Sequence, residues 1–384
     1  MNKKLTILAD ENMPHIDTLF GNNVEIKRAP GRYLKKDDLK GVDALLCRSI
    51  TQVDRTLLEG TPVKFVGTAT IGIDHLDIDF LNSFGIQWAN AAGCNAEAVA
   101  QYVMSGLALW ANKNNQSIKS LTLGIVGAGN VGTAVAKYCD WLGIRYQLCD
   151  PPLAEAGDSR DFVSFETASQ CDVVTFHVPM EKSGAYPTFH MVNQAWLENL
   201  KPSQLVINAS RGGVIDNAAL NQYLDEDDVA SVILDVFENE PDVNYELVQK
   251  VLVATPHIAG HTLEGKSRGS YMVYQAACQA LGIDSDFKES DLYPEPNQLE
   301  ESSLSFEDKL LAMYNIEQDG LKLKNVSKEQ LVLKFDELRK GYVESFRPVP
   351  RRDYSGWVFN DGLVSDESFW PEHYRNSSIS MEKD

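Results

Sequence analysis

Long hydrophobic runs are missing from this chain of 384 residues, and no apolar stretch approaches the roughly 18 residues that a membrane-spanning helix needs. The sequence therefore predicts no transmembrane segment. Long basic stretches are missing too, because 35 Lys and Arg face 55 Asp and Glu and leave a net charge of -20. This balance argues against nucleic acid or an anionic membrane surface as a main partner. An anionic substrate would have to be bound by a local cluster of arginine or lysine.

Cysteine motifs are also missing, since no CxxC pair or other spacing typical of metal ligands occurs among the six cysteines. The cysteines are Cys47, Cys94, Cys139, Cys149, Cys171 and Cys278. Most lie in apolar runs, so we expect reduced thiols in a protein core and no metal site. The start of the chain, MNKKLTILAD, passes directly into a strand-like run and lacks the apolar region of a signal peptide. We therefore expect a cytoplasmic location.

Alternating strand and helix signals run through most of the chain. Five short apolar runs predict a first α/β domain, and they are residues 5–9, 24–28, 43–47, 63–68 and 86–89. Apolar residues at helical spacing predict a long helix over 95–111, after an asparagine cap. Six later runs rich in Val, Ile and Leu are typical of buried parallel strands: LTLGIVG, RYQLCD, DVVTFHVP, QLVINAS, VASVILDV and VLVATP. The predicted fold class is α/β with two such domains.

The composition changes after a further helix that we expect at about 262–281. The segment SDFKESDLYPEPNQLEESS is rich in proline, serine and acidic residues, which is typical of a linker. Residues 300–384 contain apolar and aromatic residues of their own. We therefore expect a third, smaller domain at the C-terminal end.

A glycine-rich motif follows the first of the six later runs. In LTLGIVGAGNVG the apolar run leads directly into Gly127, Gly129, Asn130, Val131 and Gly132. In a dinucleotide-binding turn the first glycine allows the tight turn, the second lets the backbone approach a pyrophosphate, and the third lets the helix pack on the strand. The pyrophosphate would lie at the helix N-terminus. Such a motif alone also fits an ordinary glycine-rich turn, so its context decides.

The context is supplied by Asp150, which ends the next run, RYQLCD, 18 residues after Gly132. A carboxylate at this position accepts hydrogen bonds from the adenosine ribose hydroxyls and repels a 2'-phosphate. The sequence therefore predicts a dinucleotide site that prefers NAD to NADP.

Arg211, Glu240 and His257 stand in this order, each at the end of a strand-like run. The imidazole of His257 can take a C2 hydroxyl proton while the C2 hydride leaves for the nicotinamide. A carboxylate at Glu240 would fix the imidazole tautomer and stabilise the imidazolium. Arg211 can hold a substrate carboxylate and polarise the developing carbonyl. Each residue alone also fits a loop, turn or surface role, but the three together predict an enzyme that oxidises a hydroxy acid.

At this point the chain resembles the D-isomer-specific 2-hydroxyacid dehydrogenases. The resemblance covers about residues 40–285 and is carried by VGTATIGIDHLDID, GAGNVG, FHVP, INASRGGVID, LDVFENEP and PHIAGHT. It implies two Rossmann-like or flavodoxin-like α/β domains with the cofactor cleft between them. The implied substrate domain is 1–94 with 262–288, and the implied NAD-binding Rossmann domain is 95–261. Residues 289–384 would form a small C-terminal α+β dimerisation domain, so that the protein is a homodimer.

The resemblance also implies residues that line the nicotinamide side of the cleft. These are Val178, Ala209, Ser210, Asp235 and Gly260. His177, beside Val178, fits a structural role at a strand end better than a chemical one.

Further residues match substrate-contacting positions of the family. Ser49 and Thr70 are two of these, and Arg48 could hold a second anionic end of the substrate. His261 stands where we expect tyrosine in the related phosphate-specific members. In the C-terminal tail, Arg347, Arg351 and Arg352 lie within six residues of one another. They fit either a solvated basic turn or, for at least one such as Arg347, a phosphate contact made across a dimer interface.

Additional segments resemble family members that act on a phosphorylated four-carbon hydroxy acid. They are RSIT, GTAT, GCNAEAV, LCDPP and HIAGHTLEGK, together with the C-terminal extension. We therefore expect NAD and a phosphorylated hydroxy acid as ligands. Two alternatives stay open: a dehydrogenase of another hydroxy acid such as 3-phosphoglycerate or glycerate, and a dinucleotide-sensing binding protein. The intact set of three catalytic candidates disfavours the binding protein.

Overall fold

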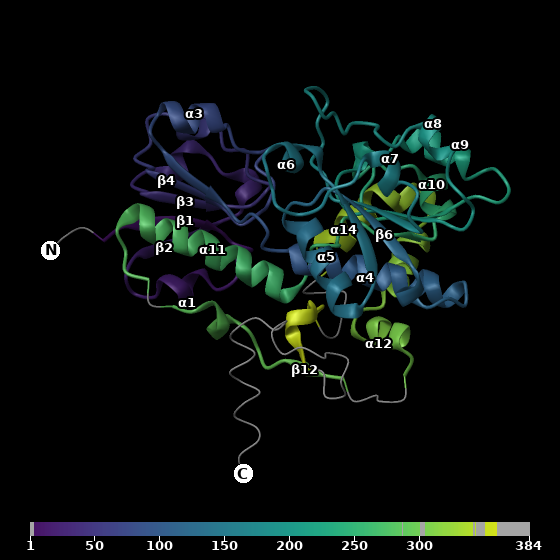
Figure 1. Cartoon of the computed structure of the whole chain (residues 1–384). Coiled ribbons are helices and arrows are strands. Elements are labelled where there is room, and N and C mark those ends of the chain that lie inside the picture. Colours follow the sequence, from purple (N-terminus) through teal and green to yellow (C-terminus); the bar gives the residue numbers. More distant parts are fainter. Residues whose placement is uncertain (1–3, 286, 300–303, 341, 343–349, 359–384) are drawn as a thin grey trace, which may run out of the picture. The chain divides into compact units, whose positions relative to one another are not determined.

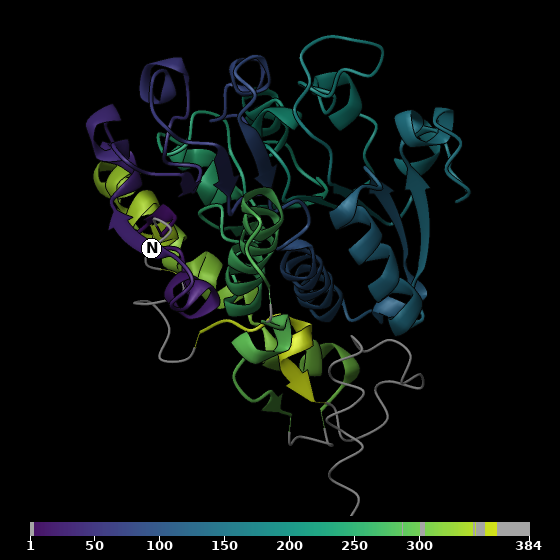
Figure 2. The same cartoon turned by 90° about the vertical axis from the view of Figure 1, so that its left-hand side faces the viewer.

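Two units make up the computed structural model, which describes residues 4–285, 287–299, 304–340, 342 and 350–358. By its contacts, the first unit contains the residues up to 95 together with 263–295. The second unit contains 96–262 and the described residues from 296 onwards. Figure 1 and Figure 2 show the course of the chain through both units.

The first unit is built on a parallel sheet with strand order β2-β1-β3-β4-β5. The strands are β1 (Thr6–Asp10), β2 (Glu25–Ala29), β3 (Ala44–Cys47), β4 (Phe65–Thr68) and β5 (Gln87–Asn90). The helices are α1 (Ile16–Phe20), α2 (Arg55–Leu58), α3 (Ile78–Ser83) and α11 (Leu263–Leu281), with short turns η1 (Gly31–Tyr33), η2 (Lys36–Leu39) and η5 (Glu289–Leu292). Helix α11 contacts β4 and β5 so closely that a Cβ on Gly67 would lie 2.4 Å from Val273 Cγ1. The chain thus returns to this sheet after completing the other one.

The second unit contains a parallel sheet with strand order β11-β10-β9-β8-β6-β7. The strands are β6 (Thr122–Val126), β7 (Arg145–Cys149), β8 (Val173–Phe176), β9 (Leu205–Asn208), β10 (Ser231–Leu234) and β11 (Val253–Ala254). The helices are α4 (Ala96–Lys113), α5 (Asn130–Leu142), α6 (Pro151–Glu155), α7 (Phe165–Ala168), α8 (Gln194–Leu197), α9 (Asn217–Tyr223) and α10 (Tyr245–Lys250), with turns η3 (Ile118–Ser120) and η4 (Gly212–Val214). Apolar residues run almost without interruption along these strands because both faces of the sheet are buried. The predicted α/β class is confirmed.

Within the second unit, the C-terminal region packs on α4 and β11. It contains α12 (Phe306–Met313), α13 (Ile316–Lys324) and α14 (Leu331–Lys340), the turns η6 (Lys328–Gln330) and η7 (Tyr354–Gly356), and the strand pair β12 (Asn297–Gln298) and β13 (Trp357–Val358). Ser105 of α4 donates a hydrogen bond to the Tyr314 carbonyl at 2.6 Å, and Glu307 accepts one from the Ile118 N–H at 2.9 Å. The boundary expected at residue 289 and the dimerisation role of this region stay predictions.

All six cysteines are free and buried, as the sequence predicts. Among the described residues no helix is both long and apolar enough to cross a membrane.

Candidate active site

The glycine-rich loop joins β6 to α5, and its geometry explains each glycine. Gly127 has a φ of +92°, and a Cβ there would lie 2.6 Å from the His177 carbonyl oxygen. A Cβ on Gly132 would lie 1.9 Å from the Gly127 carbonyl oxygen, so only glycine lets the helix pack this closely. By contrast, no described atom lies within 4 Å of a Cβ on Gly129, which leaves that side open to a ligand. The first turn of α5 contains Asn130, Val131 and Gly132.

Asp150 lies directly after β7 and holds two backbone groups. Its Oδ2 accepts a hydrogen bond from the Ala128 N–H at 2.8 Å, within the glycine-rich loop. Its Oδ1 accepts one from the Leu153 N–H at 3.1 Å and caps α6. The carboxylate therefore braces the glycine-rich loop and the start of α6.

His257 and Glu240 form a direct pair. His257 Nδ1 lies 2.7 Å from Glu240 Oε2, and the other oxygen of Glu240 accepts a hydrogen bond from the Phe237 N–H at 2.9 Å. Burial raises the pKa of the Glu240 carboxyl. The hydrogen bond and charge of His257, helped by the Phe237 N–H and the charge of Arg339, together outweigh burial, so this pKa lies below its ordinary value. The histidine side chain is 32% exposed and the glutamate side chain 16%. The pair can thus hold a proton and still reach a ligand.

Arg211 follows β9 and keeps its charge available. Its Nη1 donates to the Ser210 carbonyl at 2.8 Å, and no carboxylate forms an ion pair with it among the described residues. Strands β9, β10 and β11 are neighbours in the sheet. Arg211, Glu240 and His257 therefore emerge beyond the carboxyl ends of three adjacent parallel strands, where α/β sheets bind their ligands.

Asp235 directly follows β10 and is only 1% exposed. Its carboxylate accepts hydrogen bonds from the Thr255 hydroxyl at 2.7 Å and from the N–H groups of Ile258 at 2.7 Å and Ala259 at 2.9 Å. Burial raises the pKa of Asp235, although the charge of His257 and these hydrogen bonds oppose the rise. In the structure this side chain holds the loop that follows His257.

The other residues predicted on the nicotinamide side belong to the same unit. Val178 approaches the glycine-rich loop, since its Cγ1 would lie 2.9 Å from a Cβ on Gly127. Ala209 and Ser210 follow β9, where the Ser210 hydroxyl donates to Asn208 Oδ1 at 2.8 Å. Gly260 continues the loop after His257.

The predicted substrate residues are divided between the two units. Arg48 and Ser49 follow β3, and Thr70 follows the adjacent β4, where its hydroxyl donates to the Gly72 carbonyl at 3.0 Å. His261 is in the second unit, with its ring centre 6.3 Å from that of Tyr342. Arg347 lies outside the described residues.

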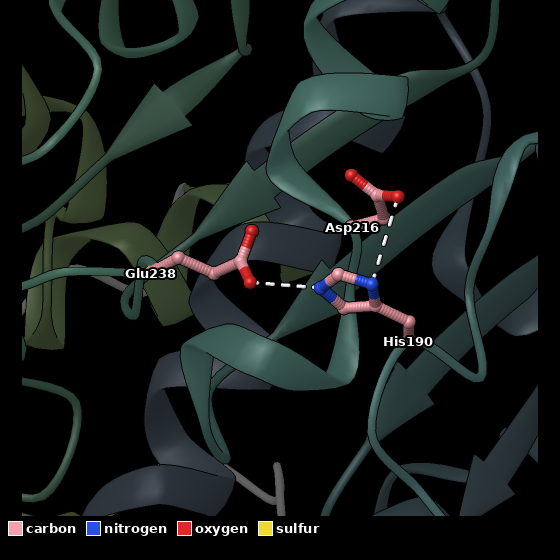
Figure 3. Close-up of side chains that lie close together, drawn as sticks. All are labelled: His190, Asp216 and Glu238. Carbon is pink, nitrogen blue, oxygen red and sulfur yellow. Dashed lines mark hydrogen bonds and ion pairs between the residues drawn. The ribbon is translucent and has the colours of Figure 1, made fainter.

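A second histidine cluster was not predicted from the sequence (Figure 3). His190 Nε2 lies 2.8 Å from Glu238 Oε1, and His190 Nδ1 lies 3.6 Å from Asp216 Oδ2. These three residue types can ligate a metal ion, and their nearest ligand atoms lie within 4.8 Å of one another. Here, however, each carboxylate faces a histidine nitrogen, so the contacts within the cluster account for all three groups.

The cluster fastens the loop after β9 to the turn after β10. Glu238 Oε2 accepts a hydrogen bond from the Asn217 N–H at 3.0 Å, and Asn217 Oδ1 accepts one from the Glu238 N–H at 3.1 Å. The two backbones touch, because a Cβ on Gly212 would lie 1.9 Å from the Phe237 carbonyl oxygen. The loop carrying Arg211 and the turn carrying Glu240 therefore form one packed assembly. The GG after Arg211 was the only sequence signal for this contact.

Comparison with known proteins agrees with this geometry. Residues 93–259 match the family model described as D-isomer specific 2-hydroxyacid dehydrogenase, NAD binding domain. An erythronate-4-phosphate dehydrogenase from Proteus mirabilis is 44% identical over 358 residues, which are 91% of this chain and 93% of the relative. One from Marinobacter nauticus is 45% identical over 351 residues, covering 88% and 91%. The chain belongs to the D-isomer-specific 2-hydroxyacid dehydrogenase family. The predicted family and the predicted NAD-dependent dehydrogenase are thereby confirmed.

Solved structures show the same fold for this dehydrogenase. A D-lactate dehydrogenase from Aquifex aeolicus, complexed with NAD and lactic acid, is 20% identical with a TM-score of 0.56. The match covers 72% of this chain and 96% of that one. The two erythronate-4-phosphate dehydrogenases match 91% and 88% of this chain, whereas the D-lactate dehydrogenase matches 72%. Part of this chain therefore has no counterpart in the D-lactate dehydrogenase structure.

Proposed function

We propose that this dehydrogenase oxidises the C2 hydroxyl of 4-phospho-D-erythronate with NAD to give 2-oxo-3-hydroxy-4-phosphobutanoate, as a step of pyridoxal 5'-phosphate biosynthesis. The observation that carries the chemistry is the 2.7 Å contact between His257 Nδ1 and Glu240 Oε2 beyond the carboxyl ends of the strands. The substrate is supported by relatives named erythronate-4-phosphate dehydrogenase, which are 41–45% identical over most of the chain.

The residues of the glycine-rich loop fit NAD. Gly129 leaves its side of the loop open, whereas side chains on Gly127 and Gly132 would collide with backbone. NAD, when bound, accepts the C2 hydride. Asp150 would hold the adenosine ribose, and the residues from Val178 to Gly260 that follow the strand ends would line the nicotinamide.

The chain's own side chains handle the proton and the charge. Nδ1 of His257 is paired with Glu240, so Nε2 is the nitrogen that takes the C2 hydroxyl proton. Glu240 then stabilises the imidazolium, because its carboxylate is already hydrogen-bonded to the ring. Arg211 holds the substrate carboxylate with a planar fork and polarises the carbonyl as it forms.

The phosphate end of the substrate needs a second cation, since Arg211 cannot hold both anionic ends. Arg48, beside Ser49, is the candidate from the first unit, with Thr70 from the next strand end. Arg347 is the candidate from the tail, and His261 could donate a hydrogen bond to a phosphate oxygen. We propose these roles on chemistry and on the family positions.

The substrate is tested by measuring NADH formation with 4-phospho-D-erythronate, unphosphorylated erythronate and 3-phosphoglycerate in parallel. We expect the highest kcat/KM with 4-phospho-D-erythronate. A higher value with 3-phosphoglycerate would move the assignment to another member of the family. NADH binding without turnover of any hydroxy acid would instead favour a dinucleotide-sensing protein.

The cofactor is tested by Asp150→Ala. Removing the carboxylate should narrow the preference for NAD over NADP, because the charge that repels a 2'-phosphate is gone. Asp172→Ala, at an exposed position before β8, is a control that should leave the preference unchanged. Equal use of both cofactors by the unmodified protein would contradict the role of Asp150.

We further propose a cytoplasmic homodimer formed through the C-terminal region. Exposed apolar side chains on α13 and α14 support this interface: Leu321 at 49%, Val332 at 46% and Leu333 at 63% exposure. Leu333→Asp should shift the protein towards monomer in sedimentation, whereas Tyr33→Asp, at an exposed position of the first unit, should not. An unchanged sedimentation coefficient for Leu333→Asp would count against this surface.

A further inference from the structure

Arg351 belongs to the C-terminal region and is 1% exposed. Its Nη1 donates to the carbonyls of Ile258 and Ala259, both at 3.1 Å, and its Nη2 to the Ala98 carbonyl at 2.7 Å. Burying a guanidinium is costly unless its N–H groups find oxygens to bind. This arginine is therefore neither a solvated surface charge nor free to bind a phosphate.

Two further contacts fix the guanidinium in place. Its Nε donates to Gln101 Oε1 at 3.0 Å, and its central carbon lies 3.7 Å from the centre of the Tyr314 ring. The Gln101 amide in turn donates to the Arg352 carbonyl at 2.9 Å. Arg351 thus joins the C-terminal segment to the start of α4 and to the loop after β11.

The peptide group between Ile258 and Ala259 lies between two buried charged side chains. Its carbonyl accepts from Arg351, and its N–H donates to Asp235 Oδ2 at 2.9 Å. Asp235 Oδ1 accepts from the preceding N–H, that of Ile258, at 2.7 Å. Opposite charges at the two ends of one peptide polarise it and strengthen both hydrogen bonds. Together they fix the two peptide planes that follow His257.

His257 itself needs this support, because its φ is +56°. Residues other than glycine rarely adopt this left-handed conformation, which persists where the surroundings enforce it. The His257 N–H donates to the Asp235 carbonyl at 2.8 Å, so the residue is held on both sides of its Cα. In this conformation the imidazole is hydrogen-bonded to Glu240.

We propose that Arg351 is a positioning residue for His257: from the C-terminal region it holds the loop that keeps the imidazole directed at Glu240 and the substrate. This role rests on the proposed function in that His257 is taken as the acid-base group. The C-terminal region would then contribute to the reaction from within the same chain, in addition to any role in assembly.

The proposal is tested with two variants. Arg351→Met keeps an unbranched side chain and removes the guanidinium group, and Arg351→Lys keeps the positive charge. The control is Glu307→Ala, because Glu307 of α12 also joins the C-terminal region to the rest of its unit, but through the Ile118 N–H at 2.9 Å and not through Arg351, Tyr314 or the His257 loop. Three quantities are compared: kcat and KM with 4-phospho-D-erythronate, NADH affinity, and the ring NMR signal of His257, assigned by its loss in His257→Asn.

Arg351→Met should lower kcat by about 10- to 100-fold, the scale of a misplacement of about 1 Å, with a smaller change in KM and NADH affinity. Its His257 ring signal should shift, and Arg351→Lys should show a smaller change of the same kind. Glu307→Ala should lower the melting temperature and leave kcat and the ring signal unchanged. If the Arg351 variants do not fold, Gln101→Met, which removes the acceptor of the Arg351 Nε–H and the donor to the Arg352 carbonyl, should show a smaller shift of the same kind.

A normal kcat and an unshifted ring signal in the folded variants would overturn the proposal and make Arg351 purely structural. A shifted ring signal in a protein that turns over no phosphorylated substrate would uphold the positioning and refute the proposed function instead.

Discussion

Two histidine–glutamate pairs take their glutamates from one turn of the second unit and differ in what the second imidazole nitrogen faces. Glu238 and Glu240 stand two residues apart, and they pair with His190 at 2.8 Å and with His257 at 2.7 Å. Both histidines have a positive φ, 52° and 56°. In the His190 pair the second imidazole nitrogen faces Asp216 at 3.6 Å. For His257 no second hydrogen-bond partner was found among the described residues.

This difference distinguishes the His190 pair, which connects two loops, from the His257 pair, which can react with a ligand. In the His190 pair both nitrogens face carboxylates, and the second glutamate oxygen accepts from the Asn217 N–H. In the His257 pair one nitrogen stays available to exchange a proton with a ligand. A histidine beside a glutamate is therefore no sign of catalysis by itself, and the open nitrogen is the informative feature.

The largest effect is expected for His257→Asn, which removes the open nitrogen. We expect kcat to fall by about 10²- to 10⁴-fold, with little change in NADH affinity. His190→Asn is the matched control, and its kcat should stay within about 10-fold of the parent, because both nitrogens of its ring already face carboxylates. Near-normal turnover by His257→Asn would end the proposed mechanism.

A smaller loss of kcat is expected for Glu240→Gln, which keeps the shape of the side chain and removes its charge. The depressed pKa of Glu240 contributes stability that is fully present above its ordinary value of 4.5 and is lost as the pH falls through the lower folded value. The parent should thus lose stability below about pH 4.5, and the variant should lack this part of the loss. Thermal unfolding between pH 3 and 6 measures the difference, and kcat should fall less than in His257→Asn.

Glu238→Gln is the matched control for that variant, because it alters the His190 pair on the same turn. Its pH profile of kcat should follow that of the parent. Identical kcat profiles for Glu240→Gln and the parent would show that the two pairs do not differ in the way inferred above.

Stability, more than turnover, should report on the His190 pair. His190→Asn leaves the Glu238 and Asp216 carboxylates without their ring partner, so we expect a loss of about 1–3 kcal/mol in the free energy of unfolding. Denaturant titration measures this loss. A full loss of NADH formation by His190→Asn with unchanged stability would give His190 a chemical role and contradict the inferred difference between the two pairs.

At neutral pH the smallest effect concerns His177, which has no carboxylate partner among the described residues. Its Nε2 lies 2.9 Å from the Thr175 hydroxyl, and burial lowers the pKa of the ring to about 3. The unfolded chain takes up this proton below about pH 6.5 and the folded chain does not, so stability should fall by at most about 1.4 kcal/mol per pH unit between these values. His177→Gln should flatten that slope, and an unchanged slope would contradict the buried neutral ring.

Much of the fold and of the candidate site could be predicted from local patterns in the sequence. The glycine-rich motif and Asp150 could be predicted because they lie within one strand–helix–strand segment, where spacing in sequence fixes position in space. Arg211, Glu240 and His257 could be placed at strand ends because parallel strands share one carboxyl edge.

Other features depend on contacts between distant segments. The His190 cluster draws its residues from three loops, and no spacing in the sequence connects them. Arg351 stands in a basic stretch, so the sequence shows its charge. The sequence does not show its burial, because the carbonyls that bind the guanidinium come from residues about 90 positions earlier. For the same reason a resemblance to shorter family members could not reveal it.

The enclosure of helix α4 decides how this dehydrogenase could be shortened by design. Gly106 lies between the sheet and α13, since a Cβ there would meet Ile233 at 2.9 Å and Ile316 at 3.6 Å. Ser105, on the same helix, is 0% exposed beneath Tyr314. A version without the C-terminal region would present this apolar surface to water, so the outer positions of α4 would first have to be rewritten with lysine and glutamate.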